Sequence, residues 1–318
     1  MPSRGVKETE KAFKRFLHPL FRLFFRKGDP SRYPVQAEKI RSILILRPDK
    51  LGDMITIIPA AHALKREFPR LRIEILASPL NKQLVDNDPV FDAVHIYRKN
   101  ILDDLPLVRH LRAKRFDIVF DTICLDSVTG LLLTKLIGNG STTAASRKQD
   151  LLRYYDYCEP YQRDGQEHNI DNGLLIFNLF GLNPATIDPF LPVHLPEESQ
   201  AKAATFLKSI GEGGEFRVGL NISAGSPTRT LEISKYAAVL DGIARDLPTA
   251  RFIIICTGED RERGRQLLRG REETAFLVPE GLSLLDAAAV ISHVDLFISP
   301  DTSLIHIARL MKIPIVGL

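Results

Sequence analysis

Apolar and polar residues alternate in a regular order from Ile40 to the end of the chain. Short apolar runs are separated by stretches in which apolar residues recur at helical spacing. This alternation is typical of parallel sheets whose two faces are covered by helices. In the first half, strands are expected at Ile43–Leu46, Arg72–Ala77, Ala93–Tyr97, Ile118–Asp121 and near Thr142. Helices are expected between them, at Ile55–Phe68, Leu105–Lys114 and Val128–Ile137.

A proline-rich stretch, Leu182–Pro196, separates this half from a second alternation. The second set of expected strands is Arg217–Asn221, Phe252–Thr257, Ala275–Val278, Leu296–Ser299 and Ile313–Val316. The helices expected with them are Ser234–Asp246, Arg261–Leu268, Ser283–Ile291 and Ser303–Met311. We therefore expect an α/β protein of two Rossmann-like domains, residues 40–190 and 191–318, facing a cleft. Ligands of such sheets bind beyond the carboxyl ends of the strands.

Residues 1–39 have a different pattern, that of a basic amphipathic arm followed by a linker. The arm carries Lys11, Lys14, Arg15, Arg22, Arg26 and Lys27 without an acidic residue between them, and its phenylalanines and leucines recur at helical spacing. Such a helix can lie in the headgroup region of a membrane through residues 11–27, or pack its phenylalanines on the folded domain or another subunit. Gly28, Asp29 and Pro30 begin the expected linker.

Composition fits a globular enzyme of two domains. The chain has 318 residues, of which 44% are hydrophobic and 26% charged, and its net charge is only +4. It lacks both an apolar run long enough to span a membrane and a secretory signal, so we expect a cytoplasmic protein. The three cysteines have neither disulfide-framework nor zinc-ligand spacing. We expect no metal and no nucleic-acid partner.

The first candidate site follows the strand at Ile43–Leu46 and leads into a helix. It reads Arg47-Pro48-Asp49-Lys50-Leu51-Gly52-Asp53. Gly52 allows the backbone to approach a ligand closely, and Asp53 stands where a helix N-cap is expected. From the residues alone, Asp53 either caps the helix or contributes a carboxylate to a reaction.

Three segments of the second half also follow expected strands. The first is a loop of small and hydroxyl residues with one cation, containing Ser223, Gly225, Ser226 and Arg229. It could hold phosphate oxygens or be a plain surface turn. The second contains Glu259 and Glu262, which either bind a ligand or stabilise a helix start. The third, with Asp301, Thr302, Ser303 and His306, heads a helix whose N–H groups can bind an anion, although Asp301 could equally cap that helix and His306 could be structural.

Two motifs, taken together, resemble those of glycosyltransferase family 9, the heptosyltransferases. They are Arg-x-x-x-Leu-Gly-Asp-x-Ile with Pro59, and Asp-Thr-Ser-x-x-His. The resemblance spans roughly Ile40 to Leu318 and implies a fold of the GT-B glycosyltransferase type. It makes Asp53 the base that deprotonates an acceptor hydroxyl. It also places Arg47 and Gly52 at the acceptor.

The resemblance further implies that the donor binds to the second half. Ser223, Gly225 and Ser226 would hold its phosphates, and Arg229, which replaces the usual lysine, would stabilise the leaving diphosphate. Glu259 or Glu262 would bind the ribose. Asp301, Thr302, Ser303 and His306 would line the diphosphate and sugar, with Ser303 in place of the family's glycine.

The implied reaction is inverting transfer of heptose from ADP-heptose to an inner-core, lipid A-linked acceptor. One carboxylate suffices for a direct displacement, and no cofactor is required. The anionic glycolipid acceptor and the basic arm agree with a peripheral position at the inner face of the cytoplasmic membrane. Because family members continue beyond the position of Leu318, we expect the second domain to be shortened. Alternative interpretations are a glycosyltransferase or epimerase for another nucleotide sugar, or a non-catalytic membrane-associated nucleotide-sugar-binding protein.

Overall fold

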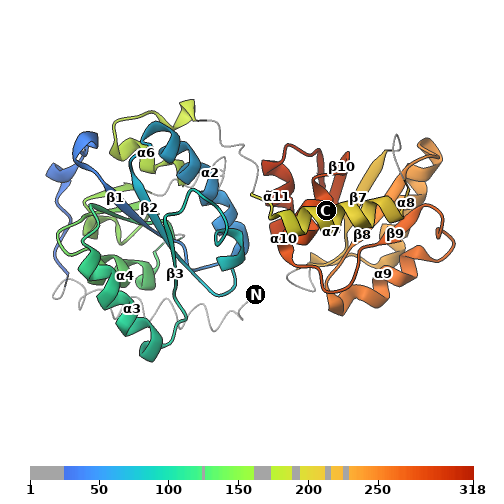
Figure 1. The fold of residues 1–318 in the computed structure, drawn as a ribbon, viewed down its shortest axis with the longest axis horizontal. Helices are drawn as coiled ribbons and strands as arrows, with labels where there is room; N and C mark the ends of the chain where they lie inside the picture. Colours follow the sequence, from blue (N-terminus) through green and yellow to red (C-terminus); the bar gives the residue numbers. More distant parts are fainter. Residues whose placement is uncertain (1–24, 124–125, 161–172, 188–193, 212–215, 225–228) are drawn as a thin grey trace. The chain divides into compact units, whose positions relative to one another are not determined.

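The protein is an α/β structure with two parallel sheets (Figure 1). The computed structural model describes residues 25–123, 126–160, 173–187, 194–211, 216–224 and 229–318. The chain divides into two compact units, residues 1–189 (unit 1) and 190–318 (unit 2).

Unit 1 contains six parallel strands in the order β3-β2-β1-β4-β5-β6. Their bounds are β1 Ser42–Leu46, β2 Arg72–Ala77, β3 Ala93–Ile96, β4 Ile118–Asp121, β5 Thr142–Lys148 and β6 Tyr157–Pro160. The helices with them are α2 Leu51–Glu67, α3 Ile101–Lys114, α4 Val128–Ile137 and α6 Ile176–Leu179. Every residue of β1 is buried, as expected for a central parallel strand covered on both faces. The sequence did not predict β6, in which Tyr157 alone is buried.

Two helices of unit 1 begin earlier than predicted. Helix α2 starts at Leu51 with Lys50 as its N-cap, so Asp53 is the third helical residue and the expected N-cap position was wrong. Helix α3 starts at Ile101, where the Asn100 side chain accepts a hydrogen bond from the N–H of Leu102. The first turn of α3 exposes Ile101 and Leu102 to solvent, so apolar periodicity did not reveal it.

Unit 2 contains five parallel strands in the order β11-β10-β7-β8-β9. Their bounds are β7 Arg217–Asn221, β8 Arg251–Ile255, β9 Ala275–Leu277, β10 Leu296–Ser299 and β11 Ile315–Gly317. The helices are α7 Glu197–Ser209, α8 Ile233–Asp246, α9 Arg261–Leu268, α10 Leu284–Ile291 and α11 Ser303–Leu310. Side chains from β7, β8 and α8, among them Leu220, Tyr236 and Phe252, form one buried core cluster. Helix α7, which was not predicted, packs against α10.

Residues 25–34, before β1, are docked on unit 1, which corrects the interpretation of residues 28–34 as a linker. Phe25 packs against the buried cluster that contains Leu131 and Tyr155. The N–H of Gly28 donates to the carbonyl of Arg153 at 3.0 Å. A Cβ atom on Gly28 would lie 1.7 Å from a backbone oxygen, so this close approach requires glycine. The remainder of the predicted arm, residues 1–24, lies outside the described residues. Among the helices that the structure describes, none has the length and apolar character needed to cross a membrane.

Candidate active site

In each unit, the predicted motifs leave the sheet where the strand order changes direction. This switch point lies between β1 and β4 in unit 1 and between β7 and β10 in unit 2. Connections from two such neighbouring strands run in opposite directions, which opens a crevice beyond their carboxyl ends. The segment Arg47 to Asp53 follows β1, whereas Ser223 follows β7 and Thr302 follows β10. The topology thus places the candidate residues where open parallel sheets bind ligands.

Arg47 is a buried centre of interactions at the first switch point. Its side chain is only 4% exposed, and its Nη1 donates to the carbonyl of Thr122 beyond β4. Its Nη2 lies 3.1 Å from Oδ1 of Asp53, and its Nε lies 3.4 Å from Oδ1 of Asp49. The Asn81 side chain donates to the backbone carbonyl of Arg47 at 2.8 Å. These contacts fix the guanidinium between β1, β4 and α2, where it is directly paired with the predicted base.

Asp53 presents a partly exposed carboxylate at the start of α2. Its side chain is 19% exposed, and one oxygen is paired with Arg47. Free N–H groups in the first helical turn favour negative charge at this position. Gly52 precedes it as the second helical residue. The arrangement orients the carboxylate while leaving part of it open to solvent.

Asp49 is a member of this cluster that the sequence analysis did not single out. Burial raises the pKa of Asp49 to about 6; the neighbouring Arg47 lowers it, and the charge of Asp53 raises it. Asp49 and Asp53 therefore share one guanidinium. From the sequence, Asp49 is one polar residue of the segment between Arg47 and Gly52, and its contact with Arg47 is evident only in the folded structure.

A second buried ion pair supports the neighbouring strands. Asp121, at the end of β4, lies 3.1 Å from Nζ of Lys148, at the end of β5, and both side chains are fully buried. The Tyr155 hydroxyl donates to Asp121 at 2.6 Å, and Lys148 also donates to the carbonyl of Ile123 at 2.6 Å. Buried charges require such satisfied partners. Burial, followed by the charge of Asp121, raises the pKa of Tyr155 well above its usual value.

Asn221 joins the two strand ends at the switch point of unit 2. This buried side chain donates to the hydroxyl of Ser299 at 2.9 Å and to that of Thr302 at 3.2 Å. It also donates to the carbonyl of Ser223 at 3.1 Å and accepts from the N–H of the same residue. Asn221 thereby fixes the loop after β7 against the loop after β10. The sequence analysis placed it at a strand end without assigning it a function.

Ser223 links the loops that follow β7 and β8. Its hydroxyl donates to Oδ2 of Asp260 at 2.6 Å and accepts from the N–H of Thr257 at 2.9 Å. A hydroxyl has one proton to donate, so in this geometry the Ser223 hydroxyl proton is already used. Ser223 therefore positions the loop. Two other predicted donor residues, Gly225 and Ser226, lie outside the described residues.

Among the described residues, Asp260 is the acid after β8 that contacts the loop after β7. Besides Ser223, it binds Arg263, whose Nη1 lies 2.7 Å from Oδ1 of Asp260. The two acids predicted to bind the donor ribose have other surroundings than Asp260. Glu259 is exposed, and Glu262 pairs on the helix surface with Arg265 at 3.1 Å. The sequence analysis missed Asp260 because its contact with Ser223 spans 37 residues.

Arg229 and Asp301 form an exposed pair at the mouth of the unit 2 site. The distance from Nη1 of Arg229 to Oδ2 of Asp301 is 2.7 Å, with side chains 47% and 66% exposed. Thr302 is the residue at the N-cap of α11, which excludes Asp301 from that position, and Ser303 is the first helical residue. His306 is half-buried near the start of the same helix. An exposed ion pair is weak, so Arg229 can turn toward an incoming anion at little cost.

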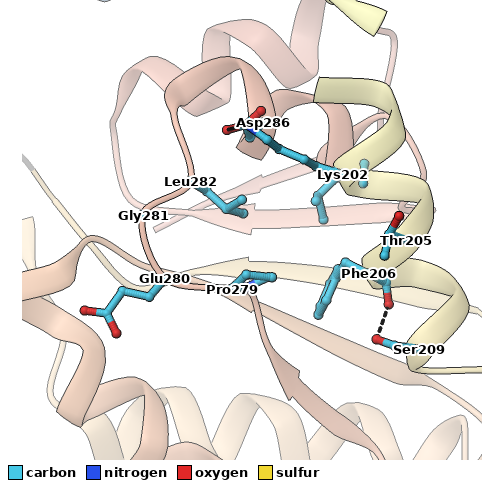
Figure 2. A pocket seen from close by; sticks show the side chains of 11 residues that line it. Lys202, Thr205, Phe206, Ser209, Pro279, Glu280, Gly281, Leu282 and Asp286 are labelled. Atoms are coloured by element: carbon cyan, nitrogen blue, oxygen red, sulfur yellow. Dashed lines mark hydrogen bonds and ion pairs between the residues drawn. The ribbon is translucent and has the colours of Figure 1, made fainter. Parts of the chain in front are cut away.

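A separate cavity of about 470 Å³ lies beside the loop after β9. Figure 2 shows Lys202 extended from α7 toward Asp286 of α10, and it shows Phe206 of α7 and Pro279 of the loop next to each other lower in the view. Nζ of Lys202 lies 3.4 Å from Oδ2 of Asp286. The lining of this cavity includes no residue of the predicted donor or acceptor sites. Within the described residues, no group of three or more acidic, histidine or cysteine side chains could hold a metal ion.

Comparison with known proteins identifies related sequences and folds. Residues 105–318 match glycosyltransferase family 9 (heptosyltransferase). The chain is 21% identical over 285 residues to lipopolysaccharide heptosyltransferase 3 of Escherichia coli, covering 84% of this chain and 80% of that protein.

Two solved structures share the fold. The first is a family 9 glycosyltransferase from Veillonella parvula, with a TM-score of 0.73, 21% identity, and coverage of 87% of this chain and 80% of that one. The second is the Escherichia coli heptosyltransferase WaaC with ADP, with a TM-score of 0.66, 18% identity, and coverage of 87% and 86%.

Proposed function

The chain belongs to glycosyltransferase family 9, and from this we propose that it transfers a heptose from ADP-heptose to an anionic, lipid A-linked inner-core acceptor, with inversion. Glycosyltransferase activity follows from the family; the proposal adds the donor and the acceptor. The similarity to a lipopolysaccharide heptosyltransferase and to a heptosyltransferase described with ADP supports both. The observation that carries the mechanism is the Arg47–Asp53 pair at the head of α2.

In the proposed reaction, Asp53 takes the proton of an acceptor hydroxyl. The hydroxyl oxygen forms a bond to the anomeric carbon of the donor as the bond from that carbon to the diphosphate breaks. Nucleoside diphosphate leaves with both bonding electrons. A sugar hydroxyl is a weak nucleophile at neutral pH, so a carboxylate within hydrogen-bond reach gives a large acceleration. Arg47 holds this carboxylate in one orientation.

The donor is proposed to bind at the loops after β7 and β10. N–H groups at the start of α11 favour the negative charge of the diphosphate, and Arg229 adds a mobile cation beside them. Asn221, Ser223 and Asp260 keep these loops in register. Arg229 and the helix start supply positive charge for the leaving group, so we propose that a metal cofactor is not required.

Membrane association is proposed for the basic segment, residues 11–27. Its cations would be attracted to anionic lipid, and its aromatic residues would enter the headgroup region. This would concentrate the enzyme on the surface where a glycolipid acceptor lies. We propose that the protein acts there, at the inner face of the cytoplasmic membrane.

The decisive test replaces Asp53 by Asn, which preserves shape and removes the base. We expect turnover to fall by roughly 10²–10⁴-fold, while ADP binding, measured by calorimetry, changes little. Asp103→Asn is the matched control, because Asp103 is also an acidic residue in the first turn of a unit 1 helix. It should retain wild-type turnover.

Turnover is measured as ADP release with and without acceptor. Release that depends on acceptor supports the transferase, whereas conversion of the donor alone would indicate an epimerase. Unchanged turnover of Asp53→Asn would remove Asp53 from the mechanism. Tighter binding of UDP or GDP than of ADP would contradict the proposed donor.

A further inference from the structure

A small cationic cavity lies at the edge of the unit 1 sheet opposite the Arg47–Asp53 pair. Its volume is about 200 Å³, and it is lined by residues around the start of β5, the end of α4 and the docked segment before β1. All strands of this sheet are parallel, so the start of β5 and the end of β1 lie at opposite edges. At about 3.3 Å per residue, a strand separates the two by on the order of 15 Å. The cavity is therefore distinct from the proposed reaction site.

Four cations line this cavity, Arg26, Lys27, Arg32 and Lys135, against two acids, Asp29 and Asp156.

Both acids are already occupied by hydrogen-bond donors. One oxygen of Asp156 accepts from the N–H of Asp29 at 2.6 Å, and the other accepts from the N–H and hydroxyl of Thr143 at 2.7 and 2.9 Å. Asp29 accepts from the N–H and hydroxyl of Ser31. The formal charge of the lining is thus +2, four cations less two acids. Asp156 uses both carboxylate oxygens to accept from protein donors, and Asp29 uses Oδ1.

The cations, in contrast, retain unused donors. Lys135 is half-buried, yet it makes no recorded hydrogen bond or ion pair with the described residues. Burial lowers the pKa of Lys135, the charge of Asp156 raises it, and the charge of Arg32 lowers it again. Arg32 uses Nη1 to donate to the carbonyls of Gly140 and Ser141 at 3.3 and 2.8 Å, so these two contacts use only one of its three guanidinium nitrogens. A half-buried ammonium group that lacks an anion is unfavourable, and a bound anion would relieve this.

We propose that this cavity binds a phosphate group. Phosphate combines negative charge with several strong acceptor oxygens, which suits an arginine fork beside a lysine. The cavity is smaller than the roughly 300–1,000 Å³ of pockets that hold whole small-molecule ligands, so it accommodates the phosphate and leaves any attached group outside. The phosphate comes either from a lipid headgroup or from free phosphate. Arg26 and Lys27, which end the basic segment, line the cavity, and this favours the headgroup.

The first test measures binding of inorganic phosphate to the full chain by calorimetry. Lys135→Met removes one charge, keeps a good helix-forming residue, and should weaken binding about tenfold or more. Lys39→Met is the matched control, because Lys39 is an exposed lysine of unit 1 outside the cavity lining. It should bind phosphate like the wild type. The double variant Arg26→Met/Lys27→Met, at exposed positions, repeats the test without altering a helix.

The proposal is overturned if wild type does not bind phosphate, or if Lys135→Met and the double variant bind it as tightly as Lys39→Met. A second arm identifies the source with phosphatidylcholine vesicles that contain or lack phosphatidic acid. Loss of phosphatidic-acid binding in Lys135→Met, but not in Lys39→Met, supports a headgroup. If Lys135→Met and Lys39→Met bind the vesicles equally, and only Lys135→Met loses binding of inorganic phosphate, the ligand is free phosphate. Turnover on a water-soluble acceptor should be unchanged in Lys135→Met, so this test is independent of the proposed transfer reaction.

Discussion

At the scale of single residues, the burial of Asp49 beside Arg47 and Asp53 has an energetic cost. Asp49 is held where its ionised form is disfavoured, with a pKa of about 6 against the usual 3.8. Folding therefore favours the protonated carboxyl. The contribution of Asp49 to stability decreases as pH rises from about 4 to about 6 and stays unfavourable at pH 7.

We predict that Asp49→Asn stabilises the protein at pH 7 by on the order of 2 kcal/mol, because the neutral amide avoids this cost. The gain should disappear below pH 4, where Asp49 is protonated in both states. Urea unfolding at pH 4 and pH 7 measures it. An equal effect of the substitution at both pH values would show that ionisation of Asp49 is not the cause. Turnover should fall at the same time, because Arg47 would then pair with Asp53 alone and hold its proton-accepting oxygens more tightly.

Some residues of the site can be recognised from the sequence around them, whereas others depend on contacts with residues far away in the sequence. Arg47, Asp53 and Thr302 could be placed from sequence, because each lies within a few residues of the end of an apolar strand. Asn221 and Asp260 could not be assigned a function, because their partners lie 81 and 37 residues away. Because a polar residue in a loop can simply be solvated, the residue type alone does not reveal these tertiary contacts. The roles of the predicted residues in binding and catalysis stay predictions.

At the scale of elements, a helix can keep a glycine for packing even at a cost in helix propensity. Gly130 lies in the first turn of α4, where an added Cβ atom would be 2.4 Å from a carboxylate oxygen of Asp121. Gly242 lies within α8, where such an atom would meet nothing within 4 Å. The same substitution should therefore have opposite effects at the two positions.

We predict that Gly130→Ala destabilises unit 1 by about 2–4 kcal/mol, because it displaces the buried Asp121–Lys148 pair. Gly242→Ala should stabilise unit 2 by about 0.5–1 kcal/mol through helix propensity. Chemical denaturation of both variants measures the difference. Stabilisation by both substitutions would mean that the Asp121 carboxylate moves away without cost.

Element boundaries were less predictable than the elements themselves. The buried strands near the centres of both sheets were recognised because continuous apolar runs mark them. Helix α7 was missed because most of its side chains are exposed and it follows a proline-rich stretch. Strand β6 was missed because only Tyr157 of its four residues is buried. Elements that bury little apolar surface leave little periodicity in the sequence.

At the scale of the whole molecule, two units with the same central strand arrangement could be expected from the repeated alternation, but the extent of unit 1 could not. Residues 28–34 looked like a linker because they contain one glycine and two prolines, and residues 25–27 looked like the end of the amphipathic arm. In the fold, Phe25 contacts a core cluster, and Asp29 and Arg32 bind backbone or side-chain partners in unit 1. A truncation chosen from the sequence would therefore remove part of a folded unit together with the arm.

Because residues 25–34 are docked on unit 1, two truncations of different length can separate the effect on membrane binding from the effect on folding. Deletion of residues 1–24 should weaken binding to anionic vesicles and leave thermal unfolding unchanged. Deletion of residues 1–34 should also destabilise unit 1 by about 2–4 kcal/mol, because it removes the Phe25 contact and the hydrogen bonds of Asp29 and Arg32. Vesicle co-sedimentation and thermal unfolding of both truncations test this. Equal unfolding temperatures would show that the docked segment adds nothing to stability, and undiminished vesicle binding after the shorter deletion would contradict the membrane role of the arm.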